Sequence, residues 1–522
     1  MNFFLLFNRA SLKHLPLIWR VLFLASIIVF FLLTISPLYY QLIFSWDQAR
    51  DAFEAYAIWH NFDFKILGPS TDFPGFYHGV IWYYLLAIPY AISQGNVLFT
   101  AYTFLIFHFI TIFFVGHLSY ELFGNKKNAM IAMTLYAFSP LVHAFTRWLS
   151  NPVISIFITP YILISLWKYL HKGGWKWAGT LGICMGLLVQ SDAGFAMFYL
   201  LIPLYLIVFR KLPTFSDMGA FLVTSVITLS TYLIAELKFN FRATWAIISF
   251  FHSSHANRSS INELLLAILN KFIDLLRFTL LPMPRIYILS ILAAVLLIIV
   301  VKRYSKEDSK PLIFLGIWLV NIILFRLFST GLTNSNFVFA PSVSVIATIG
   351  AYILTEYLKK PIVLLSVMAV LCFFQIVTIV NAIYVGTNPL AVQHGMTYYD
   401  GQKIIDYTYT KAKERPFAIH TVTNPLFINT VWAYHYEFYG KKKYHYVPFF
   451  DGKSQNGYLG NLPLLGNNNI QQYFLILEPT PGIPEMYFAE ARSGMDVYSS
   501  VRDKKSIGTF TVEIREHITK SN

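Results

Sequence analysis

The chain has 522 residues, of which 56% are hydrophobic and only 13% are charged. A soluble protein of this length carries roughly twice that charged fraction, so the composition excludes an ordinary soluble enzyme and indicates a polytopic membrane protein. The net charge of +14 is attributed to basic cytoplasmic loops and a basic outer domain, and not to nucleic-acid binding.

Eleven apolar runs are long enough, or nearly so, to cross a bilayer core, which requires about 20 apolar residues. The first run is too long for the apolar part of a cleavable signal peptide, and no small-residue cleavage site follows it, so we interpret it as a retained span. The runs lie at 17–44, 97–121, 128–146, 153–170, 175–190, 193–209, 218–236, 286–303, 311–328, 336–356 and 361–385.

A shorter apolar run at 80–93 either crosses the membrane or lies in its interface. Charge decides between these options, because only the interfacial option places all the basic loops on the side of the N-terminus. We therefore predict eleven spans, interfacial helices and a cytoplasmic N-terminus in a plasma (inner) membrane. The basic loops contain Arg9, Lys13 and Arg20, then 126–127, 171–172 with Lys176, 210–211, 302–310 and 359–360.

The opposite side then receives the acidic loop 45–79, the segment 237–285 and everything after 386. Within 237–285, residues 262–278 place their charged side chains on one helical face and Leu and Ile on the rest. This pattern predicts an amphipathic helix at the interface. Residues 1–385 form the predicted membrane domain.

Residues 386–522 form the predicted second domain, because polar residues return there with Pro and Gly between them. Helix and strand patterns alternate, which predicts a compact extracytoplasmic α/β domain. The aromatic residues Trp432, Tyr434 and Tyr436 fit either its core or a sugar-stacking surface, and we favour the core. The helix patterns lie at 400–413, 426–439 and 484–493, and the strand patterns at 416–422, 473–479 and 508–517.

Acidic residues gather directly after the first predicted span, in SWDQARDAFEAYAIWHNFDF (45–64). In a helix, Asp47, Arg50, Asp51 and Glu54 share one face. Asp47 is the first acid after the span, so its backbone is tethered close to the membrane surface. A general base must reach its proton directly, and a base acting beside a phospholipid-like donor would have to lie there.

Several motifs in this order resemble GT-C glycosyltransferases, the superfamily that includes the protein O-mannosyltransferases and the lipid A aminoarabinose transferase. DQAR (47–50) is similar to the acidic first-loop motif of that family, and FYHGVIWYYLLAIPY (76–90) is similar to its segment before the second span. ELFGNKKNAMIAMTLYAFSPLVHAFTRWLSNP (121–152) and NSNFVFAPSVSVIATIG (334–350) resemble later spans. The resemblance covers roughly residues 20–385.

The resemblance implies a GT-C-like fold and a glycosyltransferase that takes its sugar from a polyprenyl-phosphate donor among the membrane lipids. The acceptor would be an extracytoplasmic protein, lipid or cell-surface glycan. Asp47 would be the catalytic base, with Asp51 and Glu54 as supporting acids. The donor phosphate would be bound by basic side chains, since Arg offers a bidentate fork to phosphate oxygens: Arg50, His78, Arg147 and Arg326.

Four positions depart from the family pattern. Gln48 and Asn151 stand where relatives have acidic residues, and Tyr77 and His78 stand where relatives often have Glu and Lys. Amides are poor replacements for carboxylates as ligands of a hard cation. We therefore assign no cofactor, and dependence on a divalent cation is left open.

Other polar residues have two interpretations each. His252 and His255 have a spacing that suits a metal or phosphate, but exposed loop histidines usually bind neither. Arg326 lies near the outer end of a span, where a charge is either functional or extended towards the interface. Asp192, in the turn SDAG, is interpreted as a turn residue.

Two other functions stay open. A transporter or flippase would carry ionisable residues near the middle of the membrane or broken helices there, whereas these charges gather at the outer ends of spans. A non-catalytic lipid-binding assembly subunit would explain the missing carboxylates at Gln48 and Asn151. The sequence identifies neither the sugar nor the acceptor.

Overall fold

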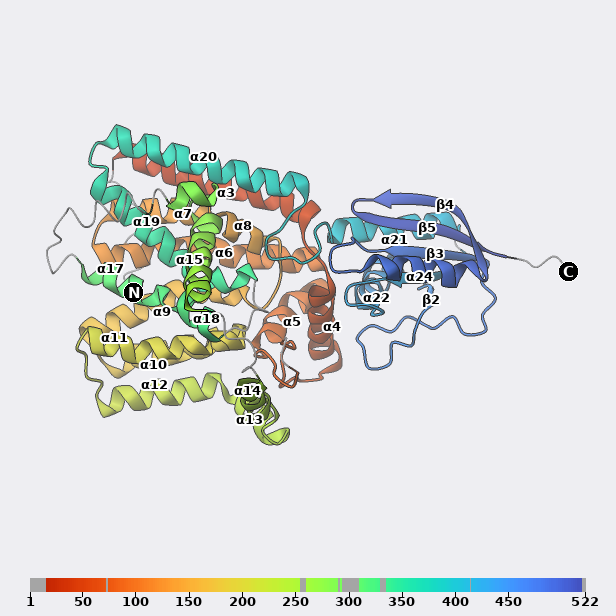
Figure 1. The fold of residues 1–522 in the computed structure, drawn as a ribbon, viewed down its shortest axis with the longest axis horizontal. Coiled ribbons are helices and arrows are strands. Elements are labelled where there is room, and N and C mark those ends of the chain that lie inside the picture. Colours follow the sequence, from red (N-terminus) through yellow and green to blue (C-terminus); the bar gives the residue numbers. More distant parts are fainter. Residues whose placement is uncertain are drawn as a thin grey trace.

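Long apolar helices form a bundle, and a smaller α/β domain lies against one end of it (Figure 1). The structure is a computed structural model that describes residues 16–71, 74–253, 260–289, 292, 309–328, 335–413 and 415–518, without the side chains of 250–253 and 326–328. The bundle helices are α3 (Leu17–Gln41), α6 (Val97–Phe123), α7 (Lys126–Ala137), α8 (Pro140–Thr146), α9 (Val153–Lys172), α10 (Trp175–Ser191), α11 (Leu201–Val208), α12 (Phe215–Thr228), α13 (Ser230–Lys238), α17 (Lys310–Leu319), α18 (Asn321–Phe328), α19 (Val343–Tyr357) and α20 (Pro361–Val385).

Two of the predicted spans are bent pairs of helices. Helices α7 and α8 meet at 55°, and α12 and α13 meet at 58°. The first bend follows from Pro140 at the start of α8, because the residue before a proline is disfavoured in the helical region. By length and composition, five helices of the described residues qualify as spans, or seven if each bent pair is one span. The predicted count of eleven stays a prediction, and most of the run 286–303 lies outside the described residues.

The basic turns share the end of the bundle that points away from the α/β domain (Figure 1). They connect α6 to α7, α9 to α10, α11 to α12 and α19 to α20. These four described turns therefore lie at one end of the bundle and the α/β domain at the other, and which end faces the cytoplasm stays a prediction.

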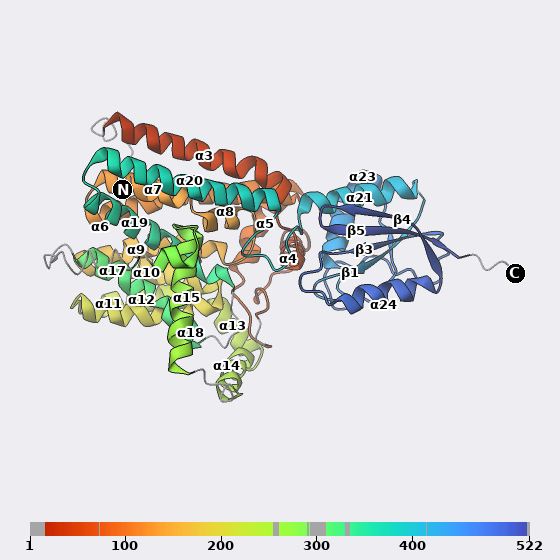
Figure 2. The same cartoon turned by 45° about the horizontal axis from the view of Figure 1, so that its top comes forward.

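The predicted amphipathic helix is α15 (Ile261–Thr279). Its N-terminus is closed by a capping box between Ser260 and Glu263. Both ribbon views show α15 crossing the bundle and not running along it (Figures 1 and 2). Its last turns are buried at Ile273 and Leu275, and its position at a membrane interface stays a prediction.

The α/β domain is built on a five-stranded mixed sheet in the order β2-β1-β3-β5-β4. Strand β1 is parallel to β2 and β3, whereas β5 is antiparallel to β3 and β4. Helices α21 and α23 cover one face and α24 covers the other (Figure 2). The elements are α21 (Tyr398–Ala412), β1 (Ala418–Val422), α22 (Thr430–Tyr434), the π-helix η4 (His435–Gly440), α23 (Lys441–Tyr444), β2 (Phe449–Phe450), β3 (Gln472–Leu477), α24 (Glu485–Asp496), β4 (Ser499–Ile507) and β5 (Phe510–His517).

The predicted α/β domain is confirmed, as are its three predicted strands and three predicted helices. Strands β2 and β4 were not predicted. Trp432, Tyr434 and Tyr436 are at most 1% exposed, so the core interpretation of these aromatic residues is correct.

The two domains are joined by main-chain hydrogen bonds at the end of α3. The Tyr398 nitrogen donates to the Leu42 oxygen at 2.9 Å, and the Phe44 nitrogen donates to the Met396 oxygen at 2.8 Å. The Phe44 ring then packs against Tyr398 and Tyr434. These contacts position α4 (Trp46–Asn61) and α5 (Ile81–Ser93) at the junction of the domains.

Candidate active site

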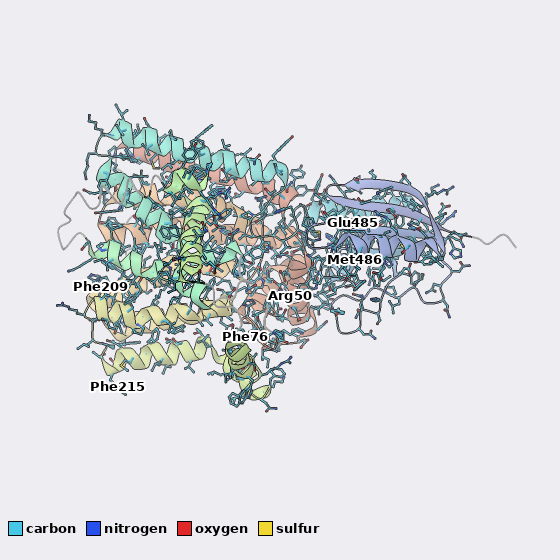
Figure 3. The ribbon with its side chains drawn as sticks, viewed as in Figure 1. Arg50, Phe76, Phe209, Phe215, Glu485 and Met486 are labelled. Atoms are coloured by element: carbon cyan, nitrogen blue, oxygen red, sulfur yellow. The ribbon has the colours of Figure 1, made fainter. Side chains whose placement is uncertain are left out.

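A cavity of about 480 Å³ lies at this junction. Its polar wall brings together Asp47 and Arg50 from α4, His78 from the loop before α5, and Asp192 from the turn after α10. Figure 3 shows Arg50 and Phe76 beside the junction, far from Phe209 and Phe215 at the other end of the bundle. The cavity therefore opens next to the end of the first span.

Helix α4 holds the acidic residues, and its first turn explains their positions. Ser45 is the N-cap, and both its main-chain nitrogen and its hydroxyl donate to Oε1 of Gln48, at 3.1 and 2.7 Å. Such a capping box fixes the start of a helix. Asp47 lies in this first turn, where the helix dipole favours a negative charge. Residues 46–61 are therefore helical, as the shared face of the acidic residues requires.

Arg50 links two of these acids. Its guanidinium lies 2.8 Å from Oδ1 of Asp47 and 2.7 Å from Oδ1 of Asp51. Asp51 is 1% exposed, and its second oxygen accepts a hydrogen bond from Nε1 of Trp82 at 2.7 Å. The buried Asp51 carboxylate therefore holds the Arg50 guanidinium in position, and Arg50 in turn positions the carboxylate of Asp47.

The two acids differ in exposure. The side chain of Asp47 is 45% exposed, so its free oxygen is open to a ligand in the cavity. Burial raises the pKa of Asp51 to about 6, although the neighbouring Arg50 guanidinium acts in the opposite direction. Asp51 is outside the cavity lining, and its role as a supporting acid stays a prediction.

Glu54 lies one turn further along α4 and does not line the cavity. Its carboxylate forms an ion pair with Lys65 at 2.9 Å, and Lys65 also pairs with Asp63 at 2.7 Å. The structure therefore places this predicted supporting acid where it ties α4 to the following loop.

His78 faces the cavity with a defined ring orientation. The Ala193 nitrogen donates to Nδ1 of His78 at 3.2 Å, and Oδ1 of Asp192 lies 3.6 Å from the same ring nitrogen. Because Nδ1 accepts a hydrogen bond, the hydrogen of the neutral ring is on Nε2. Oδ1 of Asp192 also accepts from the Gly194 nitrogen at 2.8 Å, so Asp192 is the turn residue that its sequence predicted and also part of the cavity wall.

Gln48 and Asn151, the two amides at positions where the family resemblance leads one to expect carboxylates, each form a hydrogen bond to a distant main-chain oxygen. Gln48 is 4% exposed, and its Nε2 donates to the Leu149 oxygen at 2.9 Å. Asn151 donates through Nδ2 to the Ser191 oxygen and also lines the cavity. Both bonds need an amide N–H, which a carboxylate does not have.

Of the remaining predicted residues, only Arg147 has a described side chain, and it does not line the cavity. Arg147 is 3% exposed, and its Nη2 donates to the Thr387 oxygen at 3.3 Å. Arg326 lies in α18 and His252 in α14 (Arg242–Ser253), but their side chains are outside the description, as is all of His255. Their roles stay predictions.

The described residues contain no group of three or more His, Cys, Asp or Glu side chains arranged to hold a metal ion. Asp47 is paired with Arg50, and one oxygen of Asp192 accepts from the main chain. Within the described residues, the cavity therefore shows no assembled set of ligands for a divalent cation, and no chemical step is assigned to one.

Some cavity residues were missed from the sequence. Gln393, Asn424 and Pro425 belong to the segment after α20 and to the α/β domain, yet they line the same cavity. Only the fold brings them to the end of the first span. The missed role of Trp82 had a signal in the sequence, because an indole N–H that is buried near an acid needs an acceptor.

Two solved structures of ArnT from Cupriavidus metallidurans, a lipid A aminoarabinose transferase, are similar to this chain. The apo form has a TM-score of 0.57 at 12% identity over 95% of this chain and 97% of that one. The form bound to undecaprenyl phosphate has a TM-score of 0.58 at 12% identity over 95% and 98%. The chain has the GT-C fold.

The similarity to the two ArnT structures confirms the fold that the motifs predicted. An oligosaccharyltransferase of Archaeoglobus fulgidus, in complex with Zn and sulfate, matches with a TM-score of 0.44 at 14% identity over 94% of this chain and 72% of that one. No protein-family model and no curated protein sequence matches this chain.

Proposed function

We propose that this protein is an integral membrane glycosyltransferase that transfers a sugar from a polyprenyl-phosphate donor to an acceptor outside the cytoplasm. The observation that carries the proposal is the pairing of the half-exposed Asp47 carboxylate with Arg50 in a cavity at the end of the first span. A structure with the same fold contains bound undecaprenyl phosphate, which supports a lipid phosphate as the donor group.

In the proposed reaction, the hydroxyl oxygen of the acceptor attacks the anomeric carbon of the donor sugar, and Asp47 takes the proton of that hydroxyl. The bond from that carbon to the donor phosphate breaks, and the polyprenyl phosphate leaves with the electron pair. A single in-line displacement inverts the anomeric carbon. The Arg50 guanidinium, a cationic donor, and the Nε2–H group of His78, a neutral donor, would form hydrogen bonds with the phosphate oxygens as negative charge develops on them.

The proposed location is the plasma (inner) membrane, with the N-terminus in the cytoplasm and the α/β domain outside. The basic turns at the far end of the bundle support this orientation. The cavity then opens on the outer side, where the acceptor would be.

The test uses purified Asp47→Asn with a panel of undecaprenyl-phosphate-linked sugars, and it measures sugar release from the lipid. Loss of the base is expected to lower the rate roughly 100- to 10,000-fold while binding of undecaprenyl phosphate is retained. Asp63→Asn is the matched control, since Asp63 is exposed and outside the cavity lining. Full activity of Asp47→Asn overturns the role of Asp47, and lipid binding without transfer by the wild type favours a non-catalytic subunit.

A further inference from the structure

A second cavity, of about 320 Å³, lies in the α/β domain. We call it the strand-end cavity, because it is lined by residues 420–422 at the end of β1, by the following Thr423, and by Gly452 and Lys453 just after β2. In sheets with parallel strands, ligands bind outside the carboxyl ends of the strands. Its volume is at the lower end of the range for small-molecule sites.

One loop separates this cavity from the candidate active site. Along the chain from β1 to α22, Thr423 lines the strand-end cavity, Asn424 and Pro425 line the active-site cavity, and Leu426 and Phe427 line the strand-end cavity again. The two cavities therefore lie on opposite sides of the segment 423–427. A molecule bound in the strand-end cavity would therefore lie against the segment 423–427, whose other side lines the active-site cavity.

The lining of the strand-end cavity combines aromatic faces with hydrogen-bonding groups. Phe427 and Tyr487 meet edge to face with ring centroids 5.9 Å apart, and Tyr498 completes the aromatic side. The ammonium of Lys453 lies 3.8 Å from the Phe427 ring centroid. Nδ1 of His420 is buried without a hydrogen-bond partner in the described part of the chain.

The charges of this lining cancel. Lys453 contributes one cation and Glu490 one anion. Burial lowers the pKa of His420, which disfavours the charged form of its ring, although Asp451 opposes this effect. A lining with no net charge disfavours an anionic or cationic ligand, and its exposed donors and acceptors favour a ligand with many hydroxyl groups.

We propose that the strand-end cavity binds a neutral sugar residue of the acceptor. The apolar C–H face of a pyranose suits the aromatic rings, and its hydroxyls suit the charged groups of Lys453 and Glu490. The role as an acceptor subsite rests on the proposed function, whereas the binding of a sugar does not. The loop 423–427 then separates the recognised sugar from the site of transfer.

The test measures saturation-transfer NMR signals of glucose, galactose, mannose and N-acetylglucosamine with the full chain, in a detergent whose head group is not a sugar. At least one of the four is expected to give a signal that falls fivefold or more in Glu490→Gln and in Tyr487→Ala. Glu485→Gln is the matched control, because it makes the same change on the same helix, α24, outside the cavity lining, and it is expected to keep the full signal. Figure 3 labels Glu485.

The absence of a signal from all four sugars overturns the proposal, and so does an undiminished signal in Glu490→Gln and Tyr487→Ala when both variants keep the wild-type melting temperature. Asp47→Asn is expected to leave the signal unchanged. A retained signal together with full transfer by Asp47→Asn would overturn only the catalytic assignment, which distinguishes failure of the proposed base from failure of the sugar site.

Discussion

The side-chain amide of Gln48 donates to the main-chain oxygen of Leu149 at 2.9 Å, so α4 is tied to the loop that carries Asn151. Glu is the usual partner of Ser in a capping box, but a carboxylate at this position would face a carbonyl oxygen without a hydrogen between them. We expect Gln48→Glu to lower the free energy of unfolding by about 1–3 kcal/mol, which a thermal melt of the purified protein would measure.

Gln471→Glu is the control for this substitution, because Gln471 is exposed, and its melting temperature should stay within the error of the wild type. If Gln48→Glu instead melted at the wild-type temperature and gained metal-dependent transfer, Gln48 would be a lost metal ligand and not a structural link.

Asp51 should make both stability and activity depend on pH. Its native pKa is raised from the ordinary 3.8 to about 6 by burial, so the folded chain holds this proton more tightly than the unfolded chain. The stability from Asp51 is therefore complete below pH 4 and is lost as the pH rises through 6. A difference of this size corresponds to about 3 kcal/mol. We expect the wild type to gain thermal stability relative to Asp51→Asn as the pH falls from 7 to 4.

Activity should follow the opposite trend, because only the ionised Asp51 holds Arg50 in place. We expect transfer by the wild type to fall below about pH 6. Asp63→Asn should reproduce the wild-type profiles of stability and activity. A constant difference in melting temperature between wild type and Asp51→Asn across this range would contradict the raised pKa.

His78 is expected to act through Nε2–H, since its Nδ1 accepts a hydrogen bond from the Ala193 nitrogen. The amide nitrogen of Gln reaches roughly the position of Nε2, whereas that of Asn reaches the position of Nδ1. We expect His78→Gln to keep at least tenfold more sugar-transfer activity than His78→Asn, with the difference mainly in the KM for the lipid donor. Equal losses in both variants would show that the ring itself, and not the Nε2 donor, is required.

Local patterns predicted part of the site. The spacing of Asp47, Arg50 and Asp51 predicts one helical face without any knowledge of the fold. The interpretation of Gln48 as a lost carboxylate missed its structural bond, because the acceptor at Leu149 lies 101 residues away in sequence. A bond of that kind exists only after the helices have packed.

The bundle and the sheet show the same limit. Hydropathy counted 128–146 as one span, although Ser139 before Pro140 already carries the signal for a break. Strand β4 has seven consecutive exposed residues, so it lacks the alternation that predicts a strand. Its pairing with β5 determines its conformation, and its charges protect an edge of the sheet from aggregation.

Glu478 should control the loop between the two cavities. Its side chain is 2% exposed, and its two oxygens accept hydrogen bonds from the Asn424 nitrogen at 2.9 Å and from Nε1 of Trp432 at 3.1 Å. In Glu478→Gln, one of these donors would face an NH₂ group, which leaves a buried donor unsatisfied at a cost of about 1–3 kcal/mol. We expect faster hydrogen exchange in the segment 423–427 together with a lower melting temperature, whereas Glu485→Gln should change neither. Unchanged exchange in 423–427 would show that the loop is held by its other contacts and that Glu478 does not govern the partition between the cavities.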